Sequence, residues 1–160
     1  DKIRKSPEEA VCEILLKNNG NALMAVTMCA QKVVDKIFKF PYAAVGSDGI
    51  GAGSGKKTHP RAYGNFAHLF QDYVRERKLL SWEEAVRKCT SLPYSFIGIS
   101  DKGQIKKGFD ADLVILNRKT IGTSASFAKP DLPPEGIEHV FIKGRQVVRH
   151  SKLVSESLEE

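Results

Sequence analysis

The hydrophobic positions in the first third of the chain predict helices that alternate with short buried strands. Ser6 and Glu9 have the spacing of a capping box at a helix start, and an amphipathic apolar stripe follows them. The continuous apolar runs 22–28 and 42–45 are typical of strands that are buried on both faces. Between these runs, a second amphipathic helix is predicted to turn four apolar residues inward: Val33, Val34, Ile37 and Phe38. The order helix, strand, helix, strand predicts parallel strands joined by helical crossovers.

Two further helices are predicted between residues 65 and 93. The first runs from about 65 to 77 and is expected to bury four apolar positions: Phe66, Leu69, Phe70 and Tyr73. Ser81 is a helix cap that opens the second helix, which carries Cys89 on its apolar side. We expect Pro93 to end this second helix, because proline cannot continue the hydrogen-bond ladder.

The pattern becomes strand-like in the last third of the chain. Residues 112–116 alternate into an apolar strand, and two more apolar stretches follow at 140–142 and 146–148. Lys143 and Gly144 separate these two stretches and have the composition of a tight turn. The sequence therefore predicts a hairpin near the end of the chain.

The change of pattern divides the chain into three parts. Residues 1–98 are predicted to be an α/β segment, residues 99–153 a set of β strands, and residues 154–160 a frayed polar tail. The whole chain has 160 residues, of which 41% are hydrophobic and 28% charged. This length and composition suffice for a globular domain with a hydrophobic core.

The composition also indicates the cellular compartment of the protein. No apolar run approaches the roughly 18 residues that a membrane helix needs, and the charged first residues do not resemble a signal peptide. Cys12, Cys29 and Cys89 are widely spaced and form no Cys-x-x-Cys pair. We therefore expect a cytoplasmic protein whose three cysteines are reduced thiols inside the core.

The net charge of +6 raises the question of a nucleic-acid partner. The cations are spread along the chain, apart from the pairs Lys56-Lys57 and Lys106-Lys107. No aromatic platform motif and no zinc-finger spacing accompany them. We therefore expect neither a nucleic acid nor a membrane as partner, and interpret the basic residues as scattered surface charge.

Asp48 is the first residue that could carry chemistry. It follows the apolar run 42–45, and side chains at the carboxyl ends of parallel strands lie where active sites form. Gly46 and Gly49 flank it and leave the turn open. A carboxylate at this place can bind a metal, accept a proton from water, or cap the turn. Position alone leaves the three roles open.

The glycine-rich segment that follows suggests a phosphate-binding loop, but its spacing does not fit. Ile50 occupies a position that the phosphate-loop pattern reserves for glycine, and Lys57 a position reserved for serine or threonine. Ser54 stands where the dinucleotide-binding pattern needs its third glycine. We interpret residues 50–58 as a lid or an insertion.

Arg61 is the second residue that could carry chemistry. Its guanidinium group fits a carboxylate through two parallel hydrogen bonds. The alternative is an exposed arginine at a helix start, which the positive end of the helix dipole disfavours. His59 could contact a substrate or have a structural role only, and the other histidines (His68, His139 and His150) share no ligand spacing with it.

Two motifs together resemble those of the N-acyl-D-amino-acid deacylases (D-aminoacylases) of the amidohydrolase superfamily. They are Gly-Ser-Asp-Gly at residues 46–49 and His-Pro-Arg-Ala-Tyr-Gly at residues 59–64. Residues 90–114 are similar to the closing signature of the wider superfamily, in which the chain leaves a barrel and enters a small β domain. Residues 136–144 resemble the last strands of the family. The resemblance runs from about residue 6 to residue 153.

The resemblance implies a fold and an activity. The family fold is a (β/α)₈ barrel with a flanking β-sandwich, and this chain is similar to the last βα units of the barrel and the strands that follow. The implied reaction is hydrolysis of the amide bond of N-acyl-D-amino acids with zinc as cofactor. Asp48 would lie beside the metal and take a proton from the attacking water. Arg61 would bind the α-carboxylate of the substrate, with His59 as a second substrate contact.

One departure from the family limits this expectation. The His-x-His pair and the further histidines that hold the family's metal have no counterpart in this sequence. We therefore expect a C-terminal fragment of a longer enzyme, inactive alone, with most zinc ligands outside the chain and a tendency to self-associate through open sheet edges. The alternatives are a dihydroorotase-like or other cyclic-amide hydrolase, and a non-catalytic binding module.

Overall fold

The computed structural model describes residues 5–22, 26–50 and 58–154, and its backbone contacts divide the chain into two units. The first unit, Asp1–Ala30, contains helix α1 (Pro7–Lys17). The predicted capping box at its start is confirmed, because the Glu9 amide donates to the Ser6 hydroxyl at 3.3 Å and the Glu9 carboxylate accepts from the Ser6 amide at 3.1 Å. No residue of α1 is buried within the structure.

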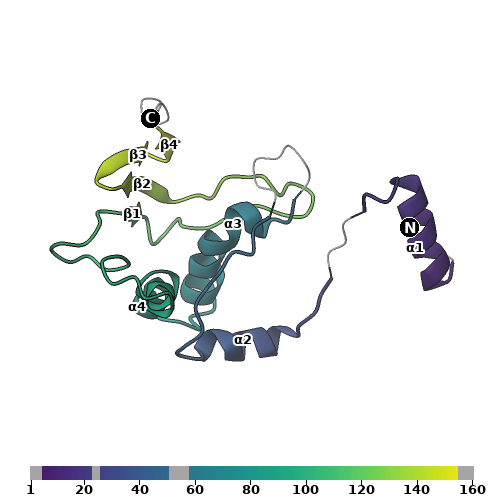
Figure 1. Ribbon diagram of the computed structural model, residues 1–160, viewed down its shortest axis with the longest axis horizontal. Helices are drawn as coiled ribbons and strands as arrows, with labels where there is room; N and C mark the ends of the chain where they lie inside the picture. Colours follow the sequence, from purple (N-terminus) through teal and green to yellow (C-terminus); the bar gives the residue numbers. More distant parts are fainter. Residues whose placement is uncertain (1–4, 23–25, 51–57, 155–160) are drawn as a thin grey trace. The chain divides into compact units, whose positions relative to one another are not determined.

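The second unit, Gln31–Glu160, contains the remaining helices and the strands. Its helices are α2 (Gln31–Lys39), α3 (Arg61–His68), the π-helical segment η1 (Leu69–Glu76), α4 (Trp82–Cys89) and α5 (Ser91–Phe96). α3 and η1 form one continuous helical segment, which confirms the helix predicted at 65–77 and starts it earlier, at Arg61 (Figure 1). None of the helices of the described part of the chain is long and apolar enough to cross a membrane.

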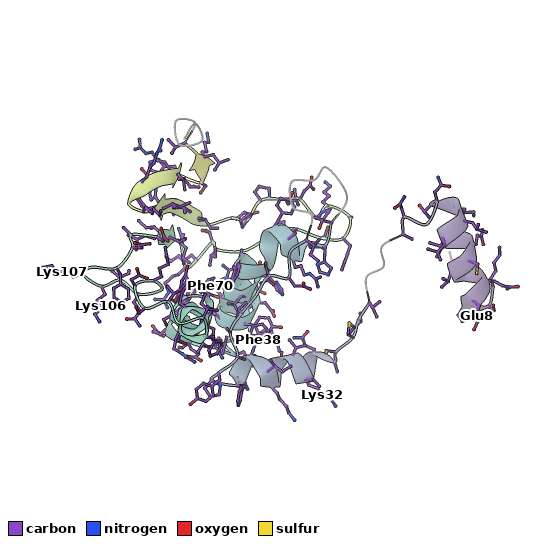
Figure 2. The ribbon with its side chains drawn as sticks, in the orientation of Figure 1. Glu8, Lys32, Phe38, Phe70, Lys106 and Lys107 are labelled. Atoms are coloured by element: carbon purple, nitrogen blue, oxygen red, sulfur yellow. The ribbon has the colours of Figure 1, made fainter. Side chains whose placement is uncertain are left out.

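The hydrophobic core lies along the α3–η1 segment. Its buried members are Ala67, Leu69, Phe70, Tyr73, Val74, Leu80, Ala85 and Ile121. Phe38 of α2 stacks on Tyr73 with ring centroids 4.2 Å apart, and Trp82 of α4 stacks on Phe70 at 5.5 Å; Figure 2 labels Phe38 and Phe70. The predicted inward positions Leu69, Phe70 and Tyr73 are therefore confirmed.

Several residues that were predicted to lie in the core are exposed. Phe66, Val33 and Ile37 are exposed, because only one narrow side of each helix meets the core. Cys12 and Cys29 are also exposed rather than buried, although no disulfide forms among the described cysteines. Cys89 is partly buried as expected, and burial raises the pKa of its thiol to about 12, so that the thiol stays protonated.

The strands form one antiparallel sheet in the order β1 (Leu113–Leu116), β2 (Ile137–Ile142), β3 (Arg145–Arg149) and β4 (Lys152–Leu153) (Figure 1). The predicted hairpin is confirmed, since β2 and β3 are joined by Lys143 at φ +48° and Gly144 at φ +79°. Two successive residues with positive φ are what a two-residue hairpin turn requires.

The two predicted parallel strands do not form among the described residues. Residues 23–25 of the first run lie outside the described part, and residues 26–28 and 42–45 pair with no strand. A parallel strand needs neighbouring strands for its hydrogen bonds, whereas Val45 instead donates its amide to the carbonyl of Lys88 at the end of α4. The strands that do form in the described ranges are all antiparallel.

Lys88 ties the segment before Asp48 to α4. Its side chain is fully buried, and its ammonium group donates to the carbonyls of Phe40 at 2.5 Å and Ala43 at 3.0 Å. The carboxylate of Glu84 lies 3.5 Å away and balances the charge. One lysine thus binds a carbonyl just after α2 and a carbonyl within residues 42–45.

Helix α4 begins as predicted but ends earlier. The Ser81 hydroxyl accepts from the Glu84 amide at 3.1 Å, which confirms the cap. The helix stops at Cys89 because Thr90, with φ −128° and ψ −92°, breaks the ladder. Pro93 lies inside the first turn of α5, where its missing amide is not needed, so its predicted role as terminator of α4 is wrong.

Candidate active site

Asp48 lies in a turn that packs against the first turn of α3. Its φ of +47° is in the left-handed region, which an aspartate tolerates better than most residues. A Cβ added to Gly49 would lie 3.0 Å from the Cα of Ala62, so a side chain here would crowd the helix and the turn would have to shift. The Asn65 side chain donates to the carbonyl of Gly46 at 3.2 Å and holds the other end of the turn.

The structure brings Asp48 and Arg61 together. Nη2 of Arg61 lies 2.6 Å from Oδ2 of Asp48, and Nε donates to the main-chain carbonyl of Asp48 at 2.9 Å. The side chain of Asp48 is 71% exposed and that of Arg61 40% exposed, so both are open to a ligand in solution. The carboxylate also offsets the unfavourable position of an arginine at a helix N-terminus.

His59 supports the start of α3. Its Nδ1 atom accepts a hydrogen bond from the Arg61 amide at 3.1 Å, which requires that this nitrogen carry no proton. Partial desolvation and then the Arg61 cation lower the pKa of His59, and Asp48 opposes them by raising it. The net lowering favours the neutral ring that the hydrogen bond needs.

Phe127 is a neighbour of this site that the sequence analysis did not identify. Its ring meets the His59 ring edge to face, with centroids 4.8 Å apart and planes at 78°. It comes from the connection between β1 and β2, far from His59 in the sequence, so no local pattern signals the contact. The predicted lid at residues 50–58 lies mostly outside the described residues; its ends meet where the Thr58 hydroxyl donates to the Ile50 carbonyl at 2.6 Å.

The donors needed for a complete metal site are not present in the described part of the chain. No group of three or more His, Cys, Asp or Glu side chains gathers there. Asp48 can supply one carboxylate ligand, whereas a catalytic zinc needs three protein ligands. His139 and His150 contact each other in the sheet, with ring centroids 5.0 Å apart, and form no such group with Asp48.

The sequence model described as "Amidohydrolase family" matches residues 42–148. The chain therefore belongs to the amidohydrolase family. The match includes Asp48, His59, Arg61 and the strands up to β3.

Among curated proteins, the chain is similar to deacylases of Alcaligenes xylosoxydans xylosoxydans. It is 37% identical over 117 residues to an N-acyl-D-aspartate deacylase, which covers 73% of this chain and 23% of the relative. It is 39% identical over 111 residues to an N-acyl-D-glutamate deacylase, with 69% and 22% covered. The chain thus spans about a quarter of the length of these relatives.

Solved structures give the same relationship. A D-aminoacylase described with a binuclear metal centre has a TM-score of 0.74 and 31% identity, over 79% of this chain and 26% of that one. An N-acyl-D-glutamate deacylase from Bordetella bronchiseptica, complexed with zinc and a phosphonate mimic of the tetrahedral intermediate, has a TM-score of 0.70 and 34% identity, over 74% and 24%. The predicted relationship to the N-acyl-D-amino-acid deacylases is confirmed.

Proposed function

We propose that this chain forms part of a zinc-dependent hydrolase that removes the acyl group from N-acyl-D-amino acids. The observation that carries the proposal is the Asp48–Arg61 pair, which joins a proton acceptor to a carboxylate-binding group inside the segment matched by the family. An N-acyl-D-amino acid presents the two groups that this pair suits, namely an amide to be attacked and a free α-carboxylate.

Arg61 binds the α-carboxylate of the substrate in the proposed reaction. Its Nε and Nη2 atoms both point at Asp48 in the structure, and a substrate carboxylate can take the place of the Asp48 carboxylate on Nη2. Substrate binding then releases the Asp48 carboxylate for proton transfer. Arg61 exchanges one carboxylate partner for another, and Asp48 keeps its negative charge in the site.

Asp48 accepts a proton from the attacking water and later donates it to the leaving amine. A bound zinc would polarise the amide carbonyl and lower the pKa of water to about 7. Of the described residues, Asp48 is the one that we assign as a zinc ligand, and the other ligands come from outside them. His59 was expected from the sequence to contact the substrate directly; in this proposal it acts on the substrate through Arg61, whose amide it holds.

The wider architecture is part of the same proposal. Residues 1–98 would contribute the last βα units of a (β/α)₈ barrel, and residues 99–153 would contribute strands of a flanking β-sandwich. The support is the family match, the similarity to solved deacylases, and the change from helices to an antiparallel sheet after α5. Within the barrel, residues 42–45 would gain the neighbouring strands that they lack here.

A test of the function compares the two enantiomers of one substrate. The enzyme that contains this chain, loaded with zinc, is assayed for amine release from N-acetyl-D- and N-acetyl-L-amino acids. The proposal predicts turnover of the D form, its loss on treatment with a chelator, and its return on addition of zinc. A chelator-resistant activity, or turnover of cyclic amides but not of N-acyl-D-amino acids, would contradict it.

A further inference from the structure

We propose that Phe127 is a positioning residue for the substrate-binding arginine. Its ring holds the ring of His59, and His59 in turn holds the amide of Arg61, from which the arginine side chain extends to Asp48. The connection between β1 and β2 thereby reaches the active site. This inference rests on the proposed role of Arg61 as the carboxylate-binding group.

The segment that carries Phe127 is anchored along η1. The guanidinium group of Arg75 donates to the carbonyl of Ile121 at 2.5 Å and to that of Lys119 at 3.1 Å. The Gln71 side chain accepts from the amide of Thr123 at 2.9 Å. Ile121 itself is 2% exposed and belongs to the core. The stem of the segment is therefore fixed to the same helical segment that begins with Arg61.

A second anchor lies within one turn of Arg61. A Cβ added to Gly64 would lie 2.5 Å from the hydroxyl oxygen of Thr123, so the segment crosses α3 at the one position that has no side chain. The Thr123 hydroxyl also accepts from the amide of Ala125 at 3.1 Å, which shapes the turn toward Phe127. The segment that leads to Phe127 is thus held close to the start of α3.

Phe127 is too exposed to act mainly by packing in the hydrophobic core. The side chain is 59% exposed and is not part of the hydrophobic core, so it contributes little to the burial of apolar surface. Its ring contact is with His59, in the edge-to-face geometry that aromatic rings prefer. Since Nδ1 of His59 meets the Arg61 amide in one ring orientation, a neighbour that restricts the ring also restricts Arg61.

The test uses three variants of the enzyme that contains this chain. Phe127→Ala removes the ring contact, Phe127→Tyr keeps it, and Phe96→Ala is the matched control because Phe96 in α5 is 57% exposed. Steady-state kinetics are measured with an N-acyl-D-amino acid and with its carboxamide. We expect Phe127→Ala to raise KM for the carboxylate substrate by about three- to tenfold with kcat within about twofold. The carboxamide, Phe127→Tyr and Phe96→Ala should show no such rise.

The coupling through His59 is tested by a double substitution. His59→Ala should raise KM to a similar degree, and the double variant should be no worse than either single one, because both break the same chain of contacts. Independent effects that multiply would overturn the proposal. So would an unchanged KM in Phe127→Ala, or an equal loss on the carboxylate and carboxamide substrates.

A measurement without catalysis separates this inference from the proposed function. Hydrogen–deuterium exchange is followed by mass spectrometry in a peptide that covers residues 58–64. The amides of this peptide should exchange faster in Phe127→Ala than in Phe96→Ala, because the contact of His59 with the Arg61 amide is loosened. If the unsubstituted enzyme does not turn over N-acyl-D-amino acids, the proposed function fails while this result still decides the positioning role. Equal exchange in the two variants would overturn it.

Discussion

Arg61 engages Asp48 through two of its nitrogen atoms, one on the carboxylate and one on the main-chain carbonyl. This geometry needs the planar guanidinium group, because a lysine offers one point charge and no second donor in the same plane. The sequence predicted that Asp48 and Arg61 both serve the site. It did not predict that they bind each other, since the contact depends on the left-handed turn at Asp48 and the close approach of Gly49 to α3.

Arg61→Lys tests the carboxylate-binding role at the scale of one residue. In the enzyme that contains this chain, we expect KM to rise about tenfold for substrates with a free α-carboxylate, because one of two hydrogen bonds is lost. kcat should change less. The comparison is made with the matching carboxamide substrates, and an equal effect on both would argue against the role.

Lys88 holds residues 42–45 in place although the neighbouring strand that the sequence suggested for them is not there in the described structure. Residues 42–45 have the composition of a strand buried on both faces, but Tyr42 is 69% exposed and the segment forms no strand. The predicted pairing fails because a parallel ladder needs at least one neighbouring strand, and none pairs with these residues in the described structure. The buried ammonium group of Lys88 instead binds the carbonyl of Ala43 within this segment and that of Phe40 just before it. No local pattern in the sequence distinguishes Lys88 from a surface lysine of α4.

Lys88→Met keeps the length of the side chain and removes its donors. The carbonyls of Phe40 and Ala43 would lose their charged partner, so we expect the free energy of unfolding to fall by about 2–4 kcal/mol. Urea denaturation of the chain measures the change. Lys152→Met in the exposed strand β4 is the control, and a loss of equal size in both variants would contradict the assigned role.

The pairing of α2 with η1 predicts a dependence of stability on pH. Asp35 of α2 forms an ion pair with Arg77 and accepts from Gln31 at 2.9 Å. The hydrogen bond from Arg77, followed by that from Gln31, lowers the pKa of Asp35 below the ordinary value of an aspartate. A carboxyl group whose pKa is lower in the folded state stabilises the fold above the unfolded pKa, and the effect disappears as the pH falls through the folded pKa.

We therefore expect the urea midpoint of the chain to fall on acidification from about pH 6 to pH 3, and to fall less in Asp35→Asn. Other carboxylates with lowered pKa values, such as Glu84, contribute the part that remains. Asp131→Asn, in an exposed turn, is the control and should keep the full pH dependence. If Asp35→Asn and Asp131→Asn behave alike, the ion pair does not stabilise α2.

At the scale of the whole molecule, the sequence predicted individual helices and turns better than the contacts between segments far apart in the chain. The helix caps at Ser6 and Ser81, the core face of η1 and the Lys143-Gly144 hairpin were predicted because each depends on neighbours close in the chain. The predicted parallel strands do not form in the described structure, and the Phe127 contact was not predicted; strand pairing and this contact both depend on segments distant in the sequence. Recognition of the family rested on the motifs that contain Asp48 and Arg61.

The number of zinc ligands at the site gives a prediction for the activity of the isolated chain. Its described residues gather one candidate zinc ligand, and a catalytic zinc needs three. We expect the isolated 160-residue chain to show no deacylase turnover even with added zinc. Turnover by a verified monomer of this length would contradict the assignment of the remaining ligands to a longer enzyme.

The most direct measurement of the central claim is the turnover of Asp48→Asn in the zinc-loaded enzyme that contains this chain. The amide is nearly isosteric with the carboxylate but cannot accept the proton from water. The account predicts that kcat for an N-acyl-D-amino acid falls by about 100- to 10,000-fold. Binding of the substrate, followed by calorimetry, should be largely kept. A kcat close to that of the unsubstituted enzyme would contradict the role of Asp48 as general base.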